Sequence, residues 1–200
     1  MEKQEHWDNI FNTQCEEILG WFEKDFSQTQ KYLEKIENLS DKDIFVSGVG
    51  TSKIANILAS RKGKTVLNDI SQEALDILKQ RIENKNVEFF HHDISKPFKK
   101  ECDVWIDRAV LHFLIDEEDI KNYFESLKQS LRKDGLVLFA QYTKGTAKKC
   151  ANLPLKQYDL EEFQSYLGKS FKLLESETFE FTMPSLNTRE FIYALYKKED

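Results

Sequence analysis

The sequence predicts an α/β fold: seven strands in one mostly parallel, doubly wound sheet, with a helical extension before it and a C-terminal antiparallel hairpin. Short apolar runs alternate with amphipathic helical patterns over residues 43–140. Two strand-like runs then follow each other without a helix between them, and residues 6–37 show helical spacing with no strand signal. We expect one domain over 1–200, with 1–40 as the extension and 41–200 as the core.

The N-terminal extension is predicted to be helical because its apolar side chains recur at roughly helical spacing. These apolar residues are Trp7, Ile10, Phe11, Ile18, Leu19, Trp21, Phe22, Phe26, Tyr32, Leu33 and Ile36. The aromatic members Trp7, Phe11, Trp21 and Phe22 have two interpretations. They form either a lid that excludes water from a binding site or the core of a docked extension. We expect a lid in which some of them pack inward.

Five parallel strands are expected in the central part of the chain. Their apolar runs lie at 44–46, 65–67, 87–90, 103–106 and 136–140. Amphipathic helical patterns separate most of these runs, for example Ala74 to Ile82 and Ile120 to Leu131. Strands joined through helices make right-handed crossovers and so run parallel, with helices on both faces of the sheet.

The C-terminal part departs from this alternation. A helix is predicted to begin at Asp159, with an acidic first turn, and to end at Gly168. Strands at 171–181 and 191–196 follow, separated by a loop at 184–187. Their direct succession predicts an antiparallel hairpin at the end of the sheet.

Composition narrows the classes of function. The net charge of −6 argues against nucleic acid or an anionic membrane as the main partner. The chain has no apolar run long enough to span a membrane, and its first residues lead us to expect no secretory signal. Cys15, Cys102 and Cys150 are odd in number and widely spaced, which fits reduced thiols in a cytoplasmic protein.

A glycine turn follows the first predicted strand. Gly48, Val49, Gly50 and Ser52 connect that strand to a helix. In open α/β sheets the ligand lies beyond the carboxyl ends of the strands, and glycine lets the backbone turn sharply and approach it. Glycine turns of this kind also occur in dinucleotide-binding folds and where no ligand binds, so the turn alone does not identify the ligand.

Acidic residues end the next two strands and sharpen this interpretation. Asp69 lies about 20 residues after the glycines, where a carboxylate accepts the ribose hydroxyls of an adenosine ligand. Its neighbour Ile70 is included in the predicted site. Asp93 can accept a hydrogen bond from the adenine amine while Ile94 packs on the ring, although Asp93 could instead be a turn or cap residue. Lys53 replaces the third glycine of the dinucleotide fingerprint, which disfavours a nicotinamide or flavin cofactor.

With these motifs, residues 43–142 resemble class I S-adenosylmethionine-dependent methyltransferases. The whole chain is similar to a small bacterial group that carries an Asp-Arg-Ala-Val-Leu-His-Phe-Leu motif, here 107–114, and a Lys-Lys-Cys-Ala-Asn-Leu segment, here 148–153. The resemblance implies a Rossmann-like fold, S-adenosylmethionine as cofactor and S-adenosylhomocysteine as product. Val46 and Ser52 depart from the family pattern, in which an acidic residue and a glycine are usual.

The 107–114 motif supplies the expected reaction centre. His112 could act as a base, Asp107 could bind the cofactor's ammonium or orient substrate, and Arg108 could hold a substrate carboxylate or pair with Asp107. The alternative is a structural Asp107–Arg108 pair with His112 under a packed helix. Tyr142 ends the fifth strand and is expected to line a substrate pocket. No metal site is predicted, because His91 and His92 point to opposite faces of a strand.

These observations favour methyl transfer to a nitrogen, sulfur or oxygen nucleophile of a small metabolite, by a monomer or homodimer. Two alternatives stay open. One is a lysine methyltransferase of the elongation-factor type, for which an open acidic groove is expected instead of a closed aromatic pocket. The other is a non-catalytic S-adenosylmethionine-binding module, suggested by Val46 and Ser52.

Overall fold

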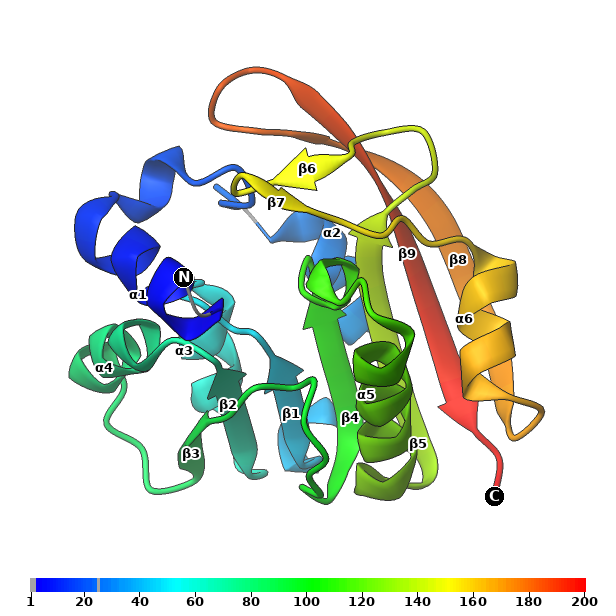
Figure 1. Ribbon diagram of the computed structural model, residues 1–200. Helices are drawn as coiled ribbons and strands as arrows, with labels where there is room; N and C mark the ends of the chain where they lie inside the picture. The colour runs from blue at the N-terminus through cyan, green and yellow to red at the C-terminus, as the bar shows by residue number, and fades with distance from the viewer. Residues whose placement is uncertain (1–2, 25) are drawn as a thin grey trace.

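Seven strands form one sheet in the order β3-β2-β1-β4-β5-β9-β8 (Figure 1). The computed structural model describes residues 3–24 and 26–200, so residues 1–2 and 25 of the expected extension lie outside the description. The strands of the sheet are β1 (Ile44–Ser47), β2 (Thr65–Asp69), β3 (Val87–His91), β4 (Cys102–Arg108), β5 (Leu131–Tyr142), β8 (Phe171–Thr182) and β9 (Thr188–Lys198). The first five run parallel, and β9 pairs antiparallel with both β5 and β8. The predicted seven-stranded α/β sheet with its C-terminal hairpin is confirmed.

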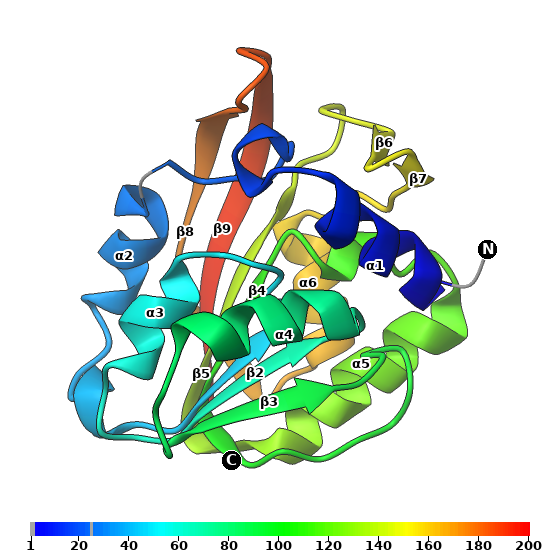
Figure 2. The same ribbon diagram turned by 90° about the vertical axis from the view of Figure 1, so that its left-hand side faces the viewer.

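Helices cover both faces of the sheet (Figures 1 and 2). They are α1 (Lys3–Thr13), α2 (Ser27–Leu33), α3 (Ile54–Ala59), α4 (Gln72–Arg81), α5 (Glu117–Ser130) and α6 (Leu160–Leu167), with short 3-10 turns η1 (Glu16–Ile18), η2 (Leu39–Asp41) and η3 (Leu111–Phe113). Helices α2, α3 and α4 pack on one face and α5 and α6 on the other, each over its own apolar cluster. Neighbouring strand residues divide between the two, as with Phe45 and Val46, because strand side chains alternate in direction.

Local sequence signals set several helix ends. The Ser71 hydroxyl caps α4 by accepting from the Ala74 N–H at 3.2 Å, and Asp159 caps α6 by accepting from the Glu162 N–H at 2.9 Å. Gly168 follows α6 with a φ of 83°. No helix is described between β3 and β4; there Phe98 stacks on Phe45 at 5.3 Å and covers that face of the sheet.

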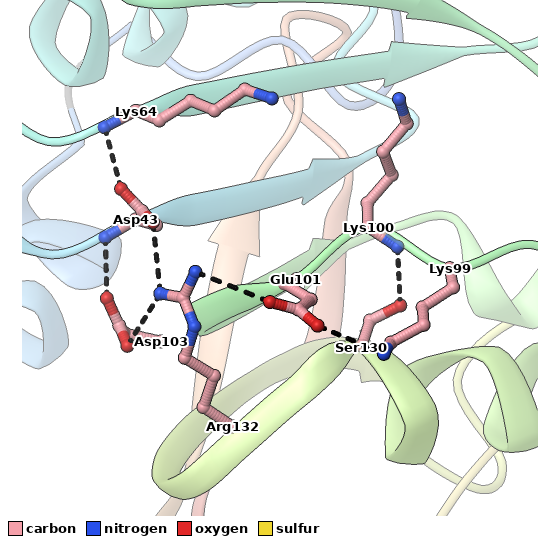
Figure 3. A network of polar contacts seen from close by, with 8 residues as sticks. All are labelled: Asp43, Lys64, Lys99, Lys100, Glu101, Asp103, Ser130 and Arg132. Carbon is pink, nitrogen blue, oxygen red and sulfur yellow. Dashed lines mark hydrogen bonds and ion pairs between the residues drawn. The ribbon is translucent and has the colours of Figure 1, made fainter.

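A polar network closes the edge where β1 and β4 begin (Figure 3). Arg132 contacts Asp43 at 3.0 Å and Asp103 at 3.1 Å, and Asp43 in turn accepts from the Lys64 N–H. The Lys100 N–H donates to the Ser130 hydroxyl beside it. This network joins β1, β2, β4 and β5 at the end of the sheet opposite the glycine turn. None of the described helices is long and apolar enough to cross a membrane.

Candidate active site

The predicted glycine turn lies at the carboxyl end of β1. Gly48 and Gly50 have φ values of 51° and 54°, a left-handed conformation that glycine adopts without strain. A Cβ on Gly48 would lie 2.7 Å from Val110 Cγ1, so the turn also packs tightly against the loop that follows β4. Both glycines are therefore required by backbone geometry as well as by any ligand.

Gly48→Ala is expected to lower the free energy of unfolding by about 2–4 kcal/mol, since it adds left-handed strain and overpacking against Val110. Gly145→Ala is the matched control, because Gly145 has a φ of 88° with nothing within 4 Å of an added Cβ. The control should lower the free energy of unfolding only by the cost of holding alanine in a left-handed backbone conformation, about 1–2 kcal/mol. Urea unfolding measures both; equal losses would show that Val110 moves aside without cost.

Asp69 is the last residue of β2 and links the second strand to the glycine turn. Its Oδ2 accepts from the Gly50 N–H at 2.7 Å, and its Oδ1 accepts from the Ser71 N–H at 2.8 Å. Burial raises the pKa of the Asp69 carboxyl to about 6, although these backbone N–H groups favour the ionised form. Asp69 also lines a cavity at this edge of the sheet.

The cavity has a volume of about 300 Å³, within the range of small-molecule sites. All nine predicted cofactor residues except Asp107 line it: Gly48, Val49, Gly50, Ser52, Asp69, Ile70, Asp93 and Ile94. Asp93 also makes the alternative turn contact, because its Oδ1 accepts from the Ser95 N–H at 2.9 Å. The carboxyl ends of β1, β2 and β3 thus bring together a glycine cradle, a buried carboxylate and an aspartate beside an apolar side chain.

The N-terminal aromatic residues form one wall of this cavity. Trp7, Phe11, Trp21 and Phe22 all line it, and the Trp7 ring contacts Trp21 at 5.5 Å and Phe113 at 4.9 Å between centroids. Phe11 lies against Gly50 and is buried with Ile10 and Leu19 in a separate apolar cluster. Phe11 therefore belongs to the core of a docked extension. The half-buried indoles of Trp7 and Trp21 face the cavity, as expected for a lid.

Arg108 lies at the end of β4 and pairs with Glu23, not with Asp107. Arg108 Nε is 3.1 Å from Glu23 Oε1, and Arg108 Nη1 donates to the Trp21 carbonyl at 3.0 Å. The guanidinium also lies over the rings of Phe181 and Phe191. Both charged side chains line the cavity.

Asp107 and His112 do not line the cavity, contrary to the sequence-based expectation. Asp107 is fully buried, and its carboxylate accepts from the Tyr123 hydroxyl at 2.7 Å and from Gln141 Nε2 at 2.6 Å. Burial raises its pKa. His112 Nδ1 contacts Gln141 Oε1 at 3.1 Å, and burial lowers the pKa of the imidazole to about 3. Both side chains belong to a buried network beneath the site.

Tyr142 likewise does not line the cavity. Its ring packs against His112 and Phe191, and its hydroxyl donates to Cys150 Sγ at 3.6 Å. Cys150 lies in a small ribbon that the sequence did not predict, formed by β6 (Lys149–Cys150) and β7 (Leu153–Pro154). The ribbon contributes Leu153 and Pro154 to the cavity wall.

Sequence reasoning assigned no role to several residues of the wall, among them Glu23, Phe113, Leu153 and Pro154. Phe113 lies within the 107–114 motif but was assigned no role. Glu23 gave no signal, because a charged residue in an amphipathic segment is usually solvated. Asn152, with a φ of 63°, was the available hint of the tight turn between β6 and β7.

Residues 45–139 match a family model described as a methyltransferase domain. No curated protein matches the chain in sequence.

Solved structures share the fold at low identity. An S-adenosylmethionine-dependent methyltransferase from Anabaena variabilis is 15% identical with a TM-score of 0.78, over 98% of this chain and 93% of that one. The N-methyltransferase NodS from Bradyrhizobium japonicum, in complex with S-adenosylhomocysteine, is 12% identical with a TM-score of 0.71, over 98% and 100%. A Haloferax volcanii protein solved with the Trm112 methyltransferase activator is 10% identical with a TM-score of 0.77, over 100% of both chains.

The cavity thus combines a cradle of two left-handed glycines, the Asp69 carboxylate at the end of β2 and Asp93 after β3. Residues 45–139 carry a methyltransferase domain, and the chain shares its fold with S-adenosylmethionine-dependent methyltransferases.

Proposed function

We propose that this enzyme methylates a nitrogen, sulfur or oxygen atom of a small metabolite. The observation that carries the proposal is the wall of Trp7, Trp21, Phe22 and Phe113 around a cavity of about 300 Å³. A protein side chain delivered on its backbone would need an open groove, whereas these rings form an aromatic wall beside the strand ends. In this proposal the N-terminal segment serves as the lid of the acceptor site.

The cofactor supplies an activated methyl group on a sulfonium. The acceptor's lone pair forms the new bond to the methyl carbon as the carbon–sulfur bond breaks, and an acceptor proton passes to solvent. This in-line displacement depends chiefly on alignment in a site from which water is excluded. The aromatic wall provides that exclusion, and the Asp107 network holds the β4 loop in place.

Transfer of label from S-adenosylmethionine to panels of thiols, amines and imidazoles tests the proposal. We expect methyl groups to appear in one low-mass class. Label that enters only protein, in a lysate offered beside the panels, would favour the lysine methyltransferase. Binding of S-adenosylmethionine with no transfer to either would favour a binding module.

We also propose that His112 positions the β4 loop and is not a general base. Its imidazole lies outside the cavity, and a pKa of about 3 keeps it neutral across the working pH range. The pH profile of kcat at saturating cofactor should therefore follow the ionisation of the acceptor. It should move when an acceptor of different pKa is used and keep its shape in His112→Gln. A limb near pH 6–7 that disappears in His112→Gln would contradict this role.

A further inference from the structure

A buried ion pair forms part of an otherwise largely aromatic stretch of the cavity wall. Arg108 and Glu23 are in contact at 3.1 Å, and their side chains are 14% and 6% exposed. Arg108 is fixed from three sides, by Glu23, by the Trp21 carbonyl and by the rings of Phe181 and Phe191. The pair thus presents one positive and one negative group to the cavity in a defined arrangement.

Stability alone is a poor explanation for this pair. The cost of removing two charges from water often exceeds their mutual attraction, and a well-packed apolar pair of similar volume is frequently at least as stable. Charged groups that face a pocket otherwise built of apolar side chains are the ones that orient a ligand. The chemistry of the pair therefore points to a ligand with both a positive and a negative group.

The order of the strands places this pair at one end of the cofactor site. Asp93 follows β3, Asp69 ends β2, the glycine turn follows β1 and Arg108 ends β4, along one edge of the sheet. Adjacent strands are about 4.8 Å apart, so the ends of β2 and β4 are separated by about 10 Å. A nucleoside with its base at Asp93 and its ribose at Asp69 extends its 5′ substituent across Gly48 towards Arg108.

In S-adenosylmethionine that substituent ends in an α-amino acid, with one ammonium and one carboxylate. At the position two residues before Gly48, the cavity wall carries the uncharged Val46. Asp107, the alternative anion on β4, points away into the buried network. Glu23 is therefore the carboxylate best placed, among the described residues, to contact the ammonium.

We propose that Arg108 and Glu23 form the subsite for the α-amino-acid end of the cofactor. Glu23 accepts a hydrogen bond from the ammonium, and Arg108 donates to the carboxylate. The guanidinium has five N–H donors. Among the described residues, Glu23, the Trp21 carbonyl and Tyr193 engage it, so donors remain for a ligand. The N-terminal segment thereby contributes a binding residue as well as a lid. The assignment rests on the proposed methyltransferase site and is independent of the acceptor.

Calorimetry with two nucleosides tests the subsite. S-adenosylhomocysteine carries the amino acid, whereas 5′-methylthioadenosine has the same nucleoside without it. Glu23→Gln should weaken S-adenosylhomocysteine about 10- to 100-fold, as expected for loss of a charged hydrogen bond, and leave 5′-methylthioadenosine within about twofold. Glu101→Gln is the matched control, because Glu101 pairs with Lys99 at 3.0 Å at the opposite end of the sheet and does not line the cavity. It should change neither affinity.

The ratio of the two affinities is the decisive quantity, because partial unfolding lowers both apparent affinities and leaves their ratio unchanged. Arg108→Lys, which keeps the charge but loses the planar fork of donors, should also lower the ratio. An unchanged ratio in both variants would overturn the subsite. If the ratio were unchanged and the variants lost methyl transfer to free amino acids, the subsite would also be overturned. The Arg108–Glu23 pair would then bind an amino-acid acceptor instead of the cofactor. If the wild-type protein bound neither nucleoside, the cofactor site itself would be wrong.

Discussion

Asp107→Ala is expected to lower the free energy of unfolding by about 3–5 kcal/mol, because it leaves several buried hydrogen-bond donors unsatisfied at about 1–3 kcal/mol each. Asp107 Oδ2 accepts from the Tyr123 hydroxyl at 2.7 Å. Its Oδ1 accepts from Gln141 Nε2 at 2.6 Å and from the Leu111 N–H at 3.2 Å. Alanine would leave the Tyr123 hydroxyl and the Leu111 N–H buried without this acceptor, while Gln141 Nε2 would keep only the backbone carbonyl of residue 107, at 3.2 Å. The free energy of unfolding of a domain of this size is about 5–15 kcal/mol, so this loss should be a measurable fraction of the total.

Urea unfolding measured by circular dichroism checks this expectation. Asp116→Ala is the control, because Asp116 is exposed and its side chain makes no capping bond at the start of α5. That change should stay within about 0.5 kcal/mol. Tyr123→Phe removes one donor and should cost less than Asp107→Ala. If Asp107→Ala unfolded within about 1 kcal/mol of the wild type, the carboxylate would not hold the network together.

The fold could be predicted because its signals are local. Apolar runs and amphipathic patterns repeat along the chain, and the direct succession of β8 and β9 after α6 already implied a hairpin. Asp159 and Gly168 bound α6 as their chemistry suggests. The β6–β7 ribbon escaped prediction because its strands are two residues long and its turn includes Ala151, which has a φ of 49° and no turn preference.

The cofactor end of the site was predictable because the residues that follow parallel strands meet at one edge of the sheet. The reaction centre was not, because side chains at the end of a strand alternate between two faces. Asp107 points to the α5 side, with Trp105 and Tyr123, whereas Arg108 points to the α2 side, with Phe181 and Phe191. Sequence gives that alternation but does not say which face opens to the cavity. Glu23 comes from a segment whose docking depends on tertiary contacts alone.

Asp69→Ala is expected to weaken S-adenosylhomocysteine by roughly 1.5–3 kcal/mol, about 10- to 150-fold, because the ribose hydroxyls lose a charged acceptor. The change also removes the acceptor for the Gly50 and Ser71 N–H groups, so the glycine turn loses its anchor. Asp76→Ala is the control, since the Asp76 side chain on α4 is 49% exposed and does not line the cavity. Calorimetry at pH 7.5 measures the three proteins, and an affinity within twofold of the wild type in Asp69→Ala would remove Asp69 from the ribose site.

The affinity for S-adenosylhomocysteine should also depend on pH through the same carboxyl. Burial raises the pKa of Asp69 to about 6, so the free protein takes up a proton there as the pH falls through that value. Ribose hydroxyls donate to the ionised form, and binding below pH 6 must therefore first release the proton. The affinity should be constant above about pH 7 and fall by up to tenfold per pH unit below about 6. Asp69→Ala has no such proton to release, so its weaker affinity should stay flat over the same range. Parallel slopes in the two proteins would assign the titration to another group.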